Sequence, residues 1–286
     1  MGGVLPDYVL GRTREEYARL ALQARIIRPY TARFFRAAGL APGMRVLDLG
    51  SGVGDVAMLA AELVGPEGHV HGIDLDATVL EHARSRASDH GFESCVTFEA
   101  SAIDEYTPAE RFDALVGRYV LLYLPDAAAT IRRLLRSVNP GGVVVFHDVD
   151  FSESQPSCPP CPLWDEGCRL VREAFERAGT PLTFGRKLGD TFVRAGLPFP
   201  VICSEGVVGG GRGSLLYGWL ATVIASLAPR LDHLGLPMPP ALAPLETLES
   251  RLEEEAVRLN GQVSITVQIG AWAHSTHFAV GESGRT

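Results

Sequence analysis

A glycine-rich turn between an apolar strand and a helix decides the fold of this chain. The stretch reads Val46-Leu47-Asp48-Leu49-Gly50-Ser51-Gly52-Val53-Gly54-Asp55. Gly50 and Gly52 let the backbone turn tightly and approach a ligand closely, and Gly54 permits close packing of the helix. The stretch therefore predicts a strand–turn–helix unit with a ligand at the turn.

Strands and helices alternate around this turn, from Met44 to Asp150. Runs typical of strands fall at residues 45–49, 69–74, 96–98, 112–117 and 143–148. Helices are expected between them at residues 55–64, 78–90 and 126–138. Because strands that alternate with helices pair in parallel, the pattern predicts a doubly wound α/β sheet.

The segments on either side are expected to add helices to this sheet. An N-terminal helix is expected to end or kink at Pro29, with a second helix over residues 30–38. The glycine run at residues 209–213 is expected to be a flexible break. Further helices are expected at residues 164–178, 186–195, 215–227 and 247–259, and further strands at residues 200–208 and 262–272.

The composition excludes several classes of protein. Hydrophobic residues make up 46% of the 286 residues, which is ample for a core and excludes intrinsic disorder. The net charge of −8 argues against a nucleic-acid partner, because duplex binders need a basic face. The longest apolar stretch covers only about 14 residues, shorter than a membrane span, and no signal-peptide pattern is visible. We therefore expect a cytoplasmic protein without a membrane partner.

The cysteines and arginines indicate a bacterial cytosol rather than a special site. Five cysteines are an odd number, which is typical of a reducing compartment. Cys158 and Cys161 have metal-ligand spacing, but no second CxxC or His pair accompanies them, and no metal site is predicted. Every basic residue except Lys187 is Arg, and we interpret this as the codon bias of a GC-rich genome.

Acidic residues around the turn indicate the kind of ligand. The second strand ends at Asp74, where a carboxylate can accept both ribose hydroxyls of an adenosine. Asp48 precedes the turn and Asp55 opens the helix, and two carboxylates suit a cationic cofactor better than a pyrophosphate. The combination predicts S-adenosylmethionine, because its ammonium and sulfonium groups are positively charged.

Four segments resemble the successive motifs of class I S-adenosylmethionine-dependent methyltransferases that act on small molecules. These segments are residues 47–55, 72–76, 112–126 and 139–150. The resemblance implies a Rossmann-like seven-stranded sheet with an antiparallel last strand, plus helical cap additions. Two alternatives stay open: a nicotinamide-dependent oxidoreductase, and a cofactor-binding relative that catalyses an isomerisation or cyclisation.

The resemblance implies roles for the residues of the turn and of the second strand. Gly50, Ser51 and Gly52 would lie beside the methionine moiety of the cofactor. Asp48 would sit under the turn and help to hold the ammonium group. Asp74 would bind the ribose hydroxyls.

The resemblance also implies contacts with the adenine ring and the methionine carboxylate. Leu75 would cover one face of the adenine. Ser101, followed by Ala102, stands where the family usually has an Asp that bonds the adenine amino group. A hydroxyl can still accept that bond. Arg118 would lie near the methionine carboxylate or a substrate acid, with an ordinary surface arginine as the alternative.

Candidate residues for the acceptor side are fewer. His147 ends the fifth strand at the ligand edge and is the candidate general base; a structural histidine is the alternative. Tyr17, Tyr123 and Trp219 are the candidate aromatic walls of the acceptor pocket, with ordinary packing as the alternative. The expected partner is a small methyl acceptor, and methylation at O, N or C is equally compatible with the sequence.

The chain is divided into five parts on these grounds. We expect an N-terminal helical cap, a cofactor-binding core, cap helices with a sixth strand, a helical insertion that acts as a substrate lid, and a last strand with a tail. Residues 215–227 are expected to be buried, with a membrane-surface helix or a homodimer contact as the alternatives. The boundaries of the five parts are residues 1–40, 41–150, 151–208, 209–260 and 261–286.

Overall fold

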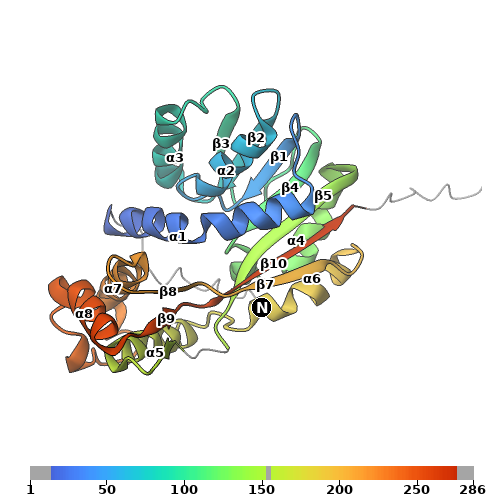
Figure 1. The fold of residues 1–286 in the computed structure, drawn as a ribbon. Helices are drawn as coiled ribbons and strands as arrows, with labels where there is room; N and C mark the ends of the chain where they lie inside the picture. The colour runs from blue at the N-terminus through green and yellow to red at the C-terminus, as the bar shows by residue number, and fades with distance from the viewer. Residues whose placement is uncertain (1–13, 153–155, 276–286) are drawn as a thin grey trace, which may run out of the picture.

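A seven-stranded sheet runs through the centre of the computed structural model, which describes residues 14–152 and 156–275 (Figure 1). Its strand order is β3-β2-β1-β4-β5-β10-β7. Neighbours pair in parallel except β10, which is antiparallel to both β5 and β7. The predicted doubly wound sheet with an antiparallel last strand is confirmed. The strands are β1 (Arg45–Leu49), β2 (His69–Asp74), β3 (Val96–Ala100), β4 (Phe112–Arg118), β5 (Val138–Asp150), β7 (Val201–Glu205) and β10 (Val267–His274).

Helices cover both faces of this sheet. One face packs on α1, α2 and α3, and the other packs on α4 and α6. Side chains of β1 alternate between the two layers, so that Val46 joins the first core and Leu47 joins the second. The helices are α1 (Arg14–Ala38), α2 (Asp55–Val64), α3 (Ala77–Asp89), α4 (Ala127–Leu134) and α6 (Leu188–Ala195), with the short 3-10 turns η1 (Leu121–Tyr123), η2 (Leu135–Ser137) and η3 (Phe184–Lys187).

Helix α1 continues through Pro29, so the expected division into two helices is wrong. Proline removes one helical N–H donor and disfavours a helix interior. The turns on both sides nevertheless pack on the sheet, where Ile27 and Phe34 are buried. Phe34 lies against Gly270 of β10, at a position where an added side chain would collide with its ring. Tertiary packing therefore outweighs the local break signal, as it does for most helices in proteins.

A helical cap with its own core lies at one end of the sheet. It consists of α5 (Pro162–Arg177), α7 (Leu215–Leu227), α8 (Leu248–Leu259) and the 3-10 turns η4 (Ala228–Arg230), η5 (Pro240–Leu242) and η6 (Leu245–Thr247). In Figure 1 these helices gather beside the start of α1. Eight of the 13 residues of α7 are buried, so this apolar helix is a core element of the cap.

A small three-stranded sheet joins the cap to β10, and it corrects two expectations. Its order is β6 (Ser157–Cys158), β9 (Gln262–Ser264) and β8 (Val208–Gly210). The glycine run expected to be a flexible break therefore begins inside a strand. Gly209 fits there because a Cβ would lie 2.6 Å from Oγ of Ser214. The single expected strand at residues 262–272 is two strands, β9 and β10, in two different sheets.

None of the helices in the two described ranges combines the length and the apolar character needed to cross a membrane.

Candidate functional site

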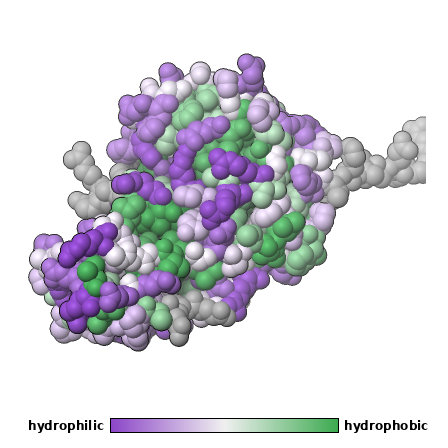
Figure 2. Space-filling view, viewed as in Figure 1, coloured by the Kyte–Doolittle hydropathy of each residue, from purple (hydrophilic) through white to green (hydrophobic). Residues whose placement is uncertain are grey.

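A cavity of about 490 Å³ lies between the carboxyl ends of the strands and the cap. Its two sides differ in chemistry. The cofactor wall is formed by lining residues of the glycine turn (50–55), the end of β2 (74–76) and residues 102–104. The cap wall is formed by lining residues of α1 (19–27), α5 and α7 together with Phe151 and residues 265–266. Figure 2 shows apolar surface gathered in the region where α1 meets the cap.

The glycine turn presents bare backbone to the cavity. Gly50 and Gly52 have φ values of +67° and +51°, which L residues with side chains rarely adopt. A Cβ on Gly50 would lie 2.7 Å from Cγ2 of Val120, so packing requires glycine there. Gly52 lines the cavity, and a Cβ on it would have no atom within 4 Å. Packing leaves that position open, so its backbone, which carries no side chain, can lie directly against a ligand.

Asp74 ties the turn to the second strand. Its Oδ2 accepts a hydrogen bond from the Gly52 amide at 2.9 Å, and its Oδ1 accepts one from the Asp76 amide at 3.0 Å. Both carboxylate oxygens keep a lone pair for a further donor. Asp74 lines the cavity, and the neighbouring Leu75 is 62% exposed on the same wall. These two predicted residues therefore lie together, where a ribose and an adenine can reach them.

Asp48 lies beneath the turn and is fully buried. Its Oδ2 accepts a hydrogen bond from Oγ of Ser51 at 2.8 Å, while its Oδ1 has no partner in the described part of the chain. Burial raises the pKa of Asp48 to about 7, opposed by the Ser51 hydrogen bond and the Arg118 charge. Asp48 is not among the described residues that line the cavity, so it acts on a ligand only through Ser51 and the turn.

Of the two residues predicted near the adenine amino group, Ser101 and Ala102, only Ala102 lines the cavity. Ala102 lines the cavity, with Ile103 and Asp104 beside it. The Ser101 hydroxyl donates to the carbonyl of Ala102 at 3.3 Å, and Ser101 is absent from the cavity lining among residues 14–152. The predicted adenine contact of Ser101 is therefore not supported by its position.

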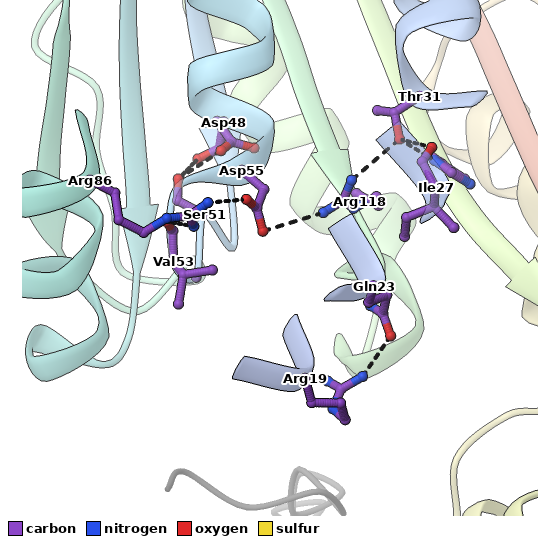
Figure 3. A network of polar contacts seen from close by, with 12 residues as sticks. Arg19, Gln23, Ile27, Thr31, Asp48, Ser51, Val53, Asp55, Arg86 and Arg118 are labelled. Carbon is purple, nitrogen blue, oxygen red and sulfur yellow. Dashed lines mark hydrogen bonds and ion pairs between the residues drawn. The ribbon is translucent and has the colours of Figure 1, made fainter. Parts of the chain in front are cut away.

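Arg118 lies at the boundary between the two walls. Its side chain is 9% exposed, and its Nη2 lies 3.9 Å from Oδ2 of Asp55. Its Nη1 donates to Oγ1 of Thr31 at 3.4 Å. Asp55 also pairs with Arg86 at 2.6 Å, so one carboxylate lies between two guanidinium groups (Figure 3). The surface alternative for Arg118 is wrong, because this arginine is held in the cavity wall.

His147 lies in the buried layer between α1 and β10, and this placement corrects its prediction as a general base. It is completely buried, and its Nδ1 and Nε2 lie 2.9 Å from Oγ1 of Thr31 and Oε1 of Gln268. Its ring also meets Phe34 edge to face, with centroids 5.0 Å apart. Burial lowers the pKa of His147 to about 3. Both ring nitrogens are therefore engaged, and the imidazole does not reach the described cavity lining.

The partners of His147 were missed from the sequence. Gln268 is fully buried in β10, and its Nε2 donates to the carbonyl of Thr266 at 2.7 Å. Its Oε1 therefore faces His147 and also accepts the hydroxyl of Tyr119. Tyr119 has a φ of +55° at the end of β4, which no local residue pattern indicates. The signal for Gln268 was available, since it is a polar residue in the middle of an apolar strand.

The three aromatic residues predicted for the acceptor pocket have different outcomes. Tyr123 and Trp219 line the cavity, Tyr123 from η1 and Trp219 from α7. The side chain of Tyr17 lies outside the described residues. Two residues that line the cavity were not predicted from the sequence: Arg19, which is 1% exposed, and Gln23. Both lie one turn apart on α1. Within the described ranges, no three His, Cys, Asp or Glu side chains converge as metal ligands would.

Comparison with known proteins places this architecture. The model of a methyltransferase domain family matches residues 40–192, more than half of the chain. The chain belongs to the class I methyltransferase family. The match begins before β1 and ends within α6, so it includes β1 to β5 and the cap helix α5 but neither β7 nor β10 of the seven-stranded sheet. The N-terminal helix α1 and most of the cap lie outside that match.

Curated relatives of this family member match over part of the chain. Aklanonic acid methyltransferase from Streptomyces sp. strain C5 is 38% identical over 36% of this chain and 47% of that protein. A ubiquinone/menaquinone biosynthesis C-methyltransferase from Shewanella sediminis is 34% identical over 41% of this chain and 47% of that protein. The chain thus spans about half the length of these two relatives.

Solved structures share the whole fold at low identity. A putative methyltransferase from Bacillus halodurans has a TM-score of 0.57 at 16% identity, covering 86% of this chain and 99% of its own. The [4+2]-cyclase SpnF has a TM-score of 0.54 at 21% identity, covering 87% of this chain and 81% of its own. At these identities the likeness is one of fold alone.

Proposed function

We propose that this protein transfers a methyl group from S-adenosylmethionine to a small, largely apolar acceptor. The observation that supports this most directly is the cavity with two unlike walls. One wall carries bare glycine backbone and carboxylates, and the other is mostly apolar and aromatic. A single concave site thus offers a polar cofactor half beside an apolar acceptor half.

The residues of the cofactor wall fit S-adenosylmethionine. The side-chain-free backbone of Gly52, the Asp74 carboxylate that accepts from it and the exposed Leu75 lie together on the wall. Beneath the turn, the partnerless Oδ1 of Asp48 adds a site that favours positive charge above it. Asp74 would accept the ribose hydroxyls, Leu75 would cover the adenine, and Arg118 would pair with the methionine carboxylate.

S-adenosylmethionine, when bound, would supply a methyl carbon on a sulfonium, which is open to in-line attack by an acceptor lone pair with the thioether sulfur as the leaving group. The chain contributes positioning, which is worth several kcal/mol when reacting atoms are held near attack distance. Arg118 and Tyr123 both line the cavity, and Arg118 lies between Asp55 of the cofactor wall and Thr31 of α1. No histidine is among the described lining residues. We therefore infer an acceptor whose attacking atom does not depend on a histidine as general base.

The setting of the reaction is also a proposal. We infer a bacterial cytosolic enzyme whose acceptor is a free small molecule rather than a nucleic acid or a membrane component. The net charge of −8 supports this choice, because it disfavours a polyanionic partner. The insertion at residues 209–260, which supplies Trp219 and Val223 to the cavity, would act as the substrate lid.

Isothermal titration tests the cofactor half. We expect S-adenosylmethionine and S-adenosylhomocysteine to bind, and NAD not to bind under the same conditions. Binding of NAD alone would overturn the proposal in favour of an oxidoreductase.

Product analysis tests the reaction. Incubation with a panel of aromatic acceptors is expected to release S-adenosylhomocysteine, measured by mass spectrometry with a methyl-labelled cofactor. Cofactor binding, combined with conversion of an acceptor that gains no labelled methyl group, would instead support the cyclase-like alternative.

A further inference from the structure

Three buried polar side chains, here called the buried network, connect the inner layer of the fold to the cavity. The network begins at Gln268 in β10 and passes through His147 in β5 to Thr31 in α1. All three residues are 0% exposed. None of them is among the lining residues in the described ranges, but the Thr31 oxygen contacts Arg118, which does line the cavity. The network can therefore act on a ligand through Arg118.

The direction of these hydrogen bonds is fixed at Gln268. Its Nε2 lies 2.7 Å from the carbonyl of Thr266, and a carbonyl can only accept, so the orientation of the amide is determined. The opposite atom, Oε1, accepts the hydroxyl of Tyr119 and lies 2.9 Å from Nε2 of His147. An amide oxygen cannot donate, so Nε2 of His147 carries the hydrogen of that bond.

The other ring nitrogen of His147 then orients the Thr31 hydroxyl. Burial and the charge of Arg118 lower the pKa of His147 to about 3, so the imidazole is neutral and its Nδ1 carries no hydrogen. Nδ1 is therefore an acceptor, and the Thr31 hydroxyl, 2.9 Å away, is its donor. The carbonyl of Ile27 lies further from the same oxygen, at 3.3 Å. The hydrogen of Thr31 thus points to the imidazole, and the lone pairs of its oxygen point elsewhere.

The Thr31 oxygen is consequently an acceptor for Arg118. Nη1 of Arg118 donates to it at 3.4 Å, and Nη2 lies 3.9 Å from Oδ2 of Asp55 (Figure 3). The two contacts hold the guanidinium from opposite sides, one from α1 and one from the cofactor wall. A guanidinium has five N–H donors, so these contacts leave donors for a carboxylate. A side chain that is already held loses less rotamer freedom when a ligand binds.

We propose that Thr31 is a positioning residue for cofactor binding: its hydroxyl, oriented by His147, holds the Arg118 guanidinium in place for the methionine carboxylate. The inference rests on the proposed function, because it concerns the contact of Arg118 with the cofactor proposed for this cavity. It assigns the buried histidine a role without proton transfer, which is to keep the lone pairs of the Thr31 oxygen directed at Arg118.

The test compares two ligands that differ only in one carboxylate: S-adenosylhomocysteine and its decarboxylated form, S-adenosyl-3-thiopropylamine. Their affinities for the full 286-residue chain are measured by isothermal titration, and their ratio is the carboxylate preference. We expect the wild-type protein to prefer S-adenosylhomocysteine by at least about tenfold, the lower end of the range for a hydrogen bond to a charged group. A general loss of stability lowers both affinities together and leaves this ratio unchanged.

Variants of Thr31 test the positioning role. Thr31→Val keeps the shape of the side chain without its hydroxyl. We expect it to reduce the carboxylate preference about fivefold, within the range for one hydrogen bond, while the affinity for the decarboxylated ligand stays within about twofold. Thr31→Ser keeps the hydroxyl and should retain the preference.

Thr191→Val is the matched control, because Thr191 is also a buried helical threonine whose hydroxyl donates to the carbonyl four residues earlier, at 2.8 Å. It lies in α6, on the other face of the sheet, and should leave the carboxylate preference unchanged. A preference that survives Thr31→Val, or that falls equally in Thr191→Val, would overturn the inference.

A double variant determines whether Thr31 acts through Arg118. Arg118→Met should abolish the carboxylate preference. Adding Thr31→Val to Arg118→Met should leave the affinity for S-adenosylhomocysteine unchanged, because both substitutions affect one contact. A further loss of affinity in the double variant would mean that Thr31 acts by another route, and would overturn its positioning role.

Thr31→Cys provides another variant in case Thr31→Val does not fold. A thiol can still donate weakly to His147 but is a poor acceptor for Arg118, so we expect the carboxylate preference to fall here as well. A retained preference would count against Thr31. Failure of the proposed function has a different signature, because the wild-type protein then binds neither ligand. Failure of this inference alone leaves S-adenosylhomocysteine bound, with a preference that does not depend on Thr31.

Discussion

The cofactor wall and the cap wall are built in opposite ways. Three short segments within residues 50–104 form the cofactor wall, and backbone amides tie its central carboxylate, Asp74, in place. The cap wall draws residues from α1, α5, α7 and the link before β10. A local motif thus forms the cofactor wall, whereas long-range packing forms the cap wall.

The sheet and the cap also have separate hydrophobic cores. The sheet is covered by two apolar clusters, and the cap residues of α5, α7 and α8 form a third of their own. A substitution inside the cap cluster removes contacts mainly within the cap. Acceptor selection can therefore change without disturbing the strand order that holds the cofactor wall.

The largest expected effect is on the cofactor wall. Asp74→Ala removes acceptors for the Gly52 and Asp76 amides together with the proposed ribose contact. Each charge-assisted hydrogen bond is worth about 1.5–3 kcal/mol, so S-adenosylhomocysteine affinity should fall about 100-fold or more by titration calorimetry. Asp89→Ala, an exposed residue at the end of α3, is the matched control. Unchanged affinity in the Asp74 variant would break the assignment of this wall.

The second effect concerns the buried layer beside the two walls. His147→Phe leaves Thr31 and Gln268 without their ring partner and should lower the free energy of unfolding by about 2–3 kcal/mol. Urea unfolding measures this change. A variant of unchanged stability whose turnover collapses would restore His147 as a base and contradict its structural role.

The third effect separates packing from ligand approach within the glycine turn. Gly50→Ala meets Val120 and should lower the melting temperature, whereas Gly52→Ala has open space and should act mainly on the ligand. Both carry the strain of a positive φ, about 1 kcal/mol. We expect S-adenosylhomocysteine affinity to fall about tenfold in Gly52→Ala, or about 1.4 kcal/mol. Equal thermal losses without an affinity change would show that the turn is only structural.

The smallest effect, taken per pH unit, is a pH dependence of stability. Burial raises the pKa of Asp148 to about 8, and its Oδ2 has no partner among the described residues. The folded state therefore holds a proton that the unfolded state loses above about pH 4, so stability falls as the pH rises toward 8. Asp148→Asn removes the part of this dependence that Asp148 causes, while the part caused by Asp48, whose pKa burial raises to about 7, stays in place. The stability of the variant relative to wild type should rise by at most about 1.4 kcal/mol per pH unit across that window.

The control for this prediction is His147, which makes stability change with pH in the opposite direction. Its pKa is lowered to about 3, so the unfolded state binds the extra proton, and stability falls as the pH drops below about 6.5. Asp148→Asn leaves that acid-side loss in place. Urea midpoints measured from pH 5 to pH 9 distinguish the two, and a pH-independent difference between variant and wild type would contradict the role of Asp148.

Local patterns predicted most elements well. The bounds of α2 and α7 agree with those expected. The errors lie where distant residues outweigh local signals. Pro29 stays inside a helix because both neighbouring turns pack on the sheet, and Gly209 joins a strand because β9 pairs with it.

The sequence by itself determined the sheet class, the glycine turn and the carboxylate at the end of β2, because each depends on residues close together in the chain. Only the tertiary structure decided that His147 is enclosed by Thr31 and Gln268, and that Arg19 lines the cavity beside Trp219. These pairs are separated by more than 100 residues, and no local periodicity records such contacts. The cofactor half of the site is therefore a property of short-range sequence, and the acceptor half is a property of the folded chain.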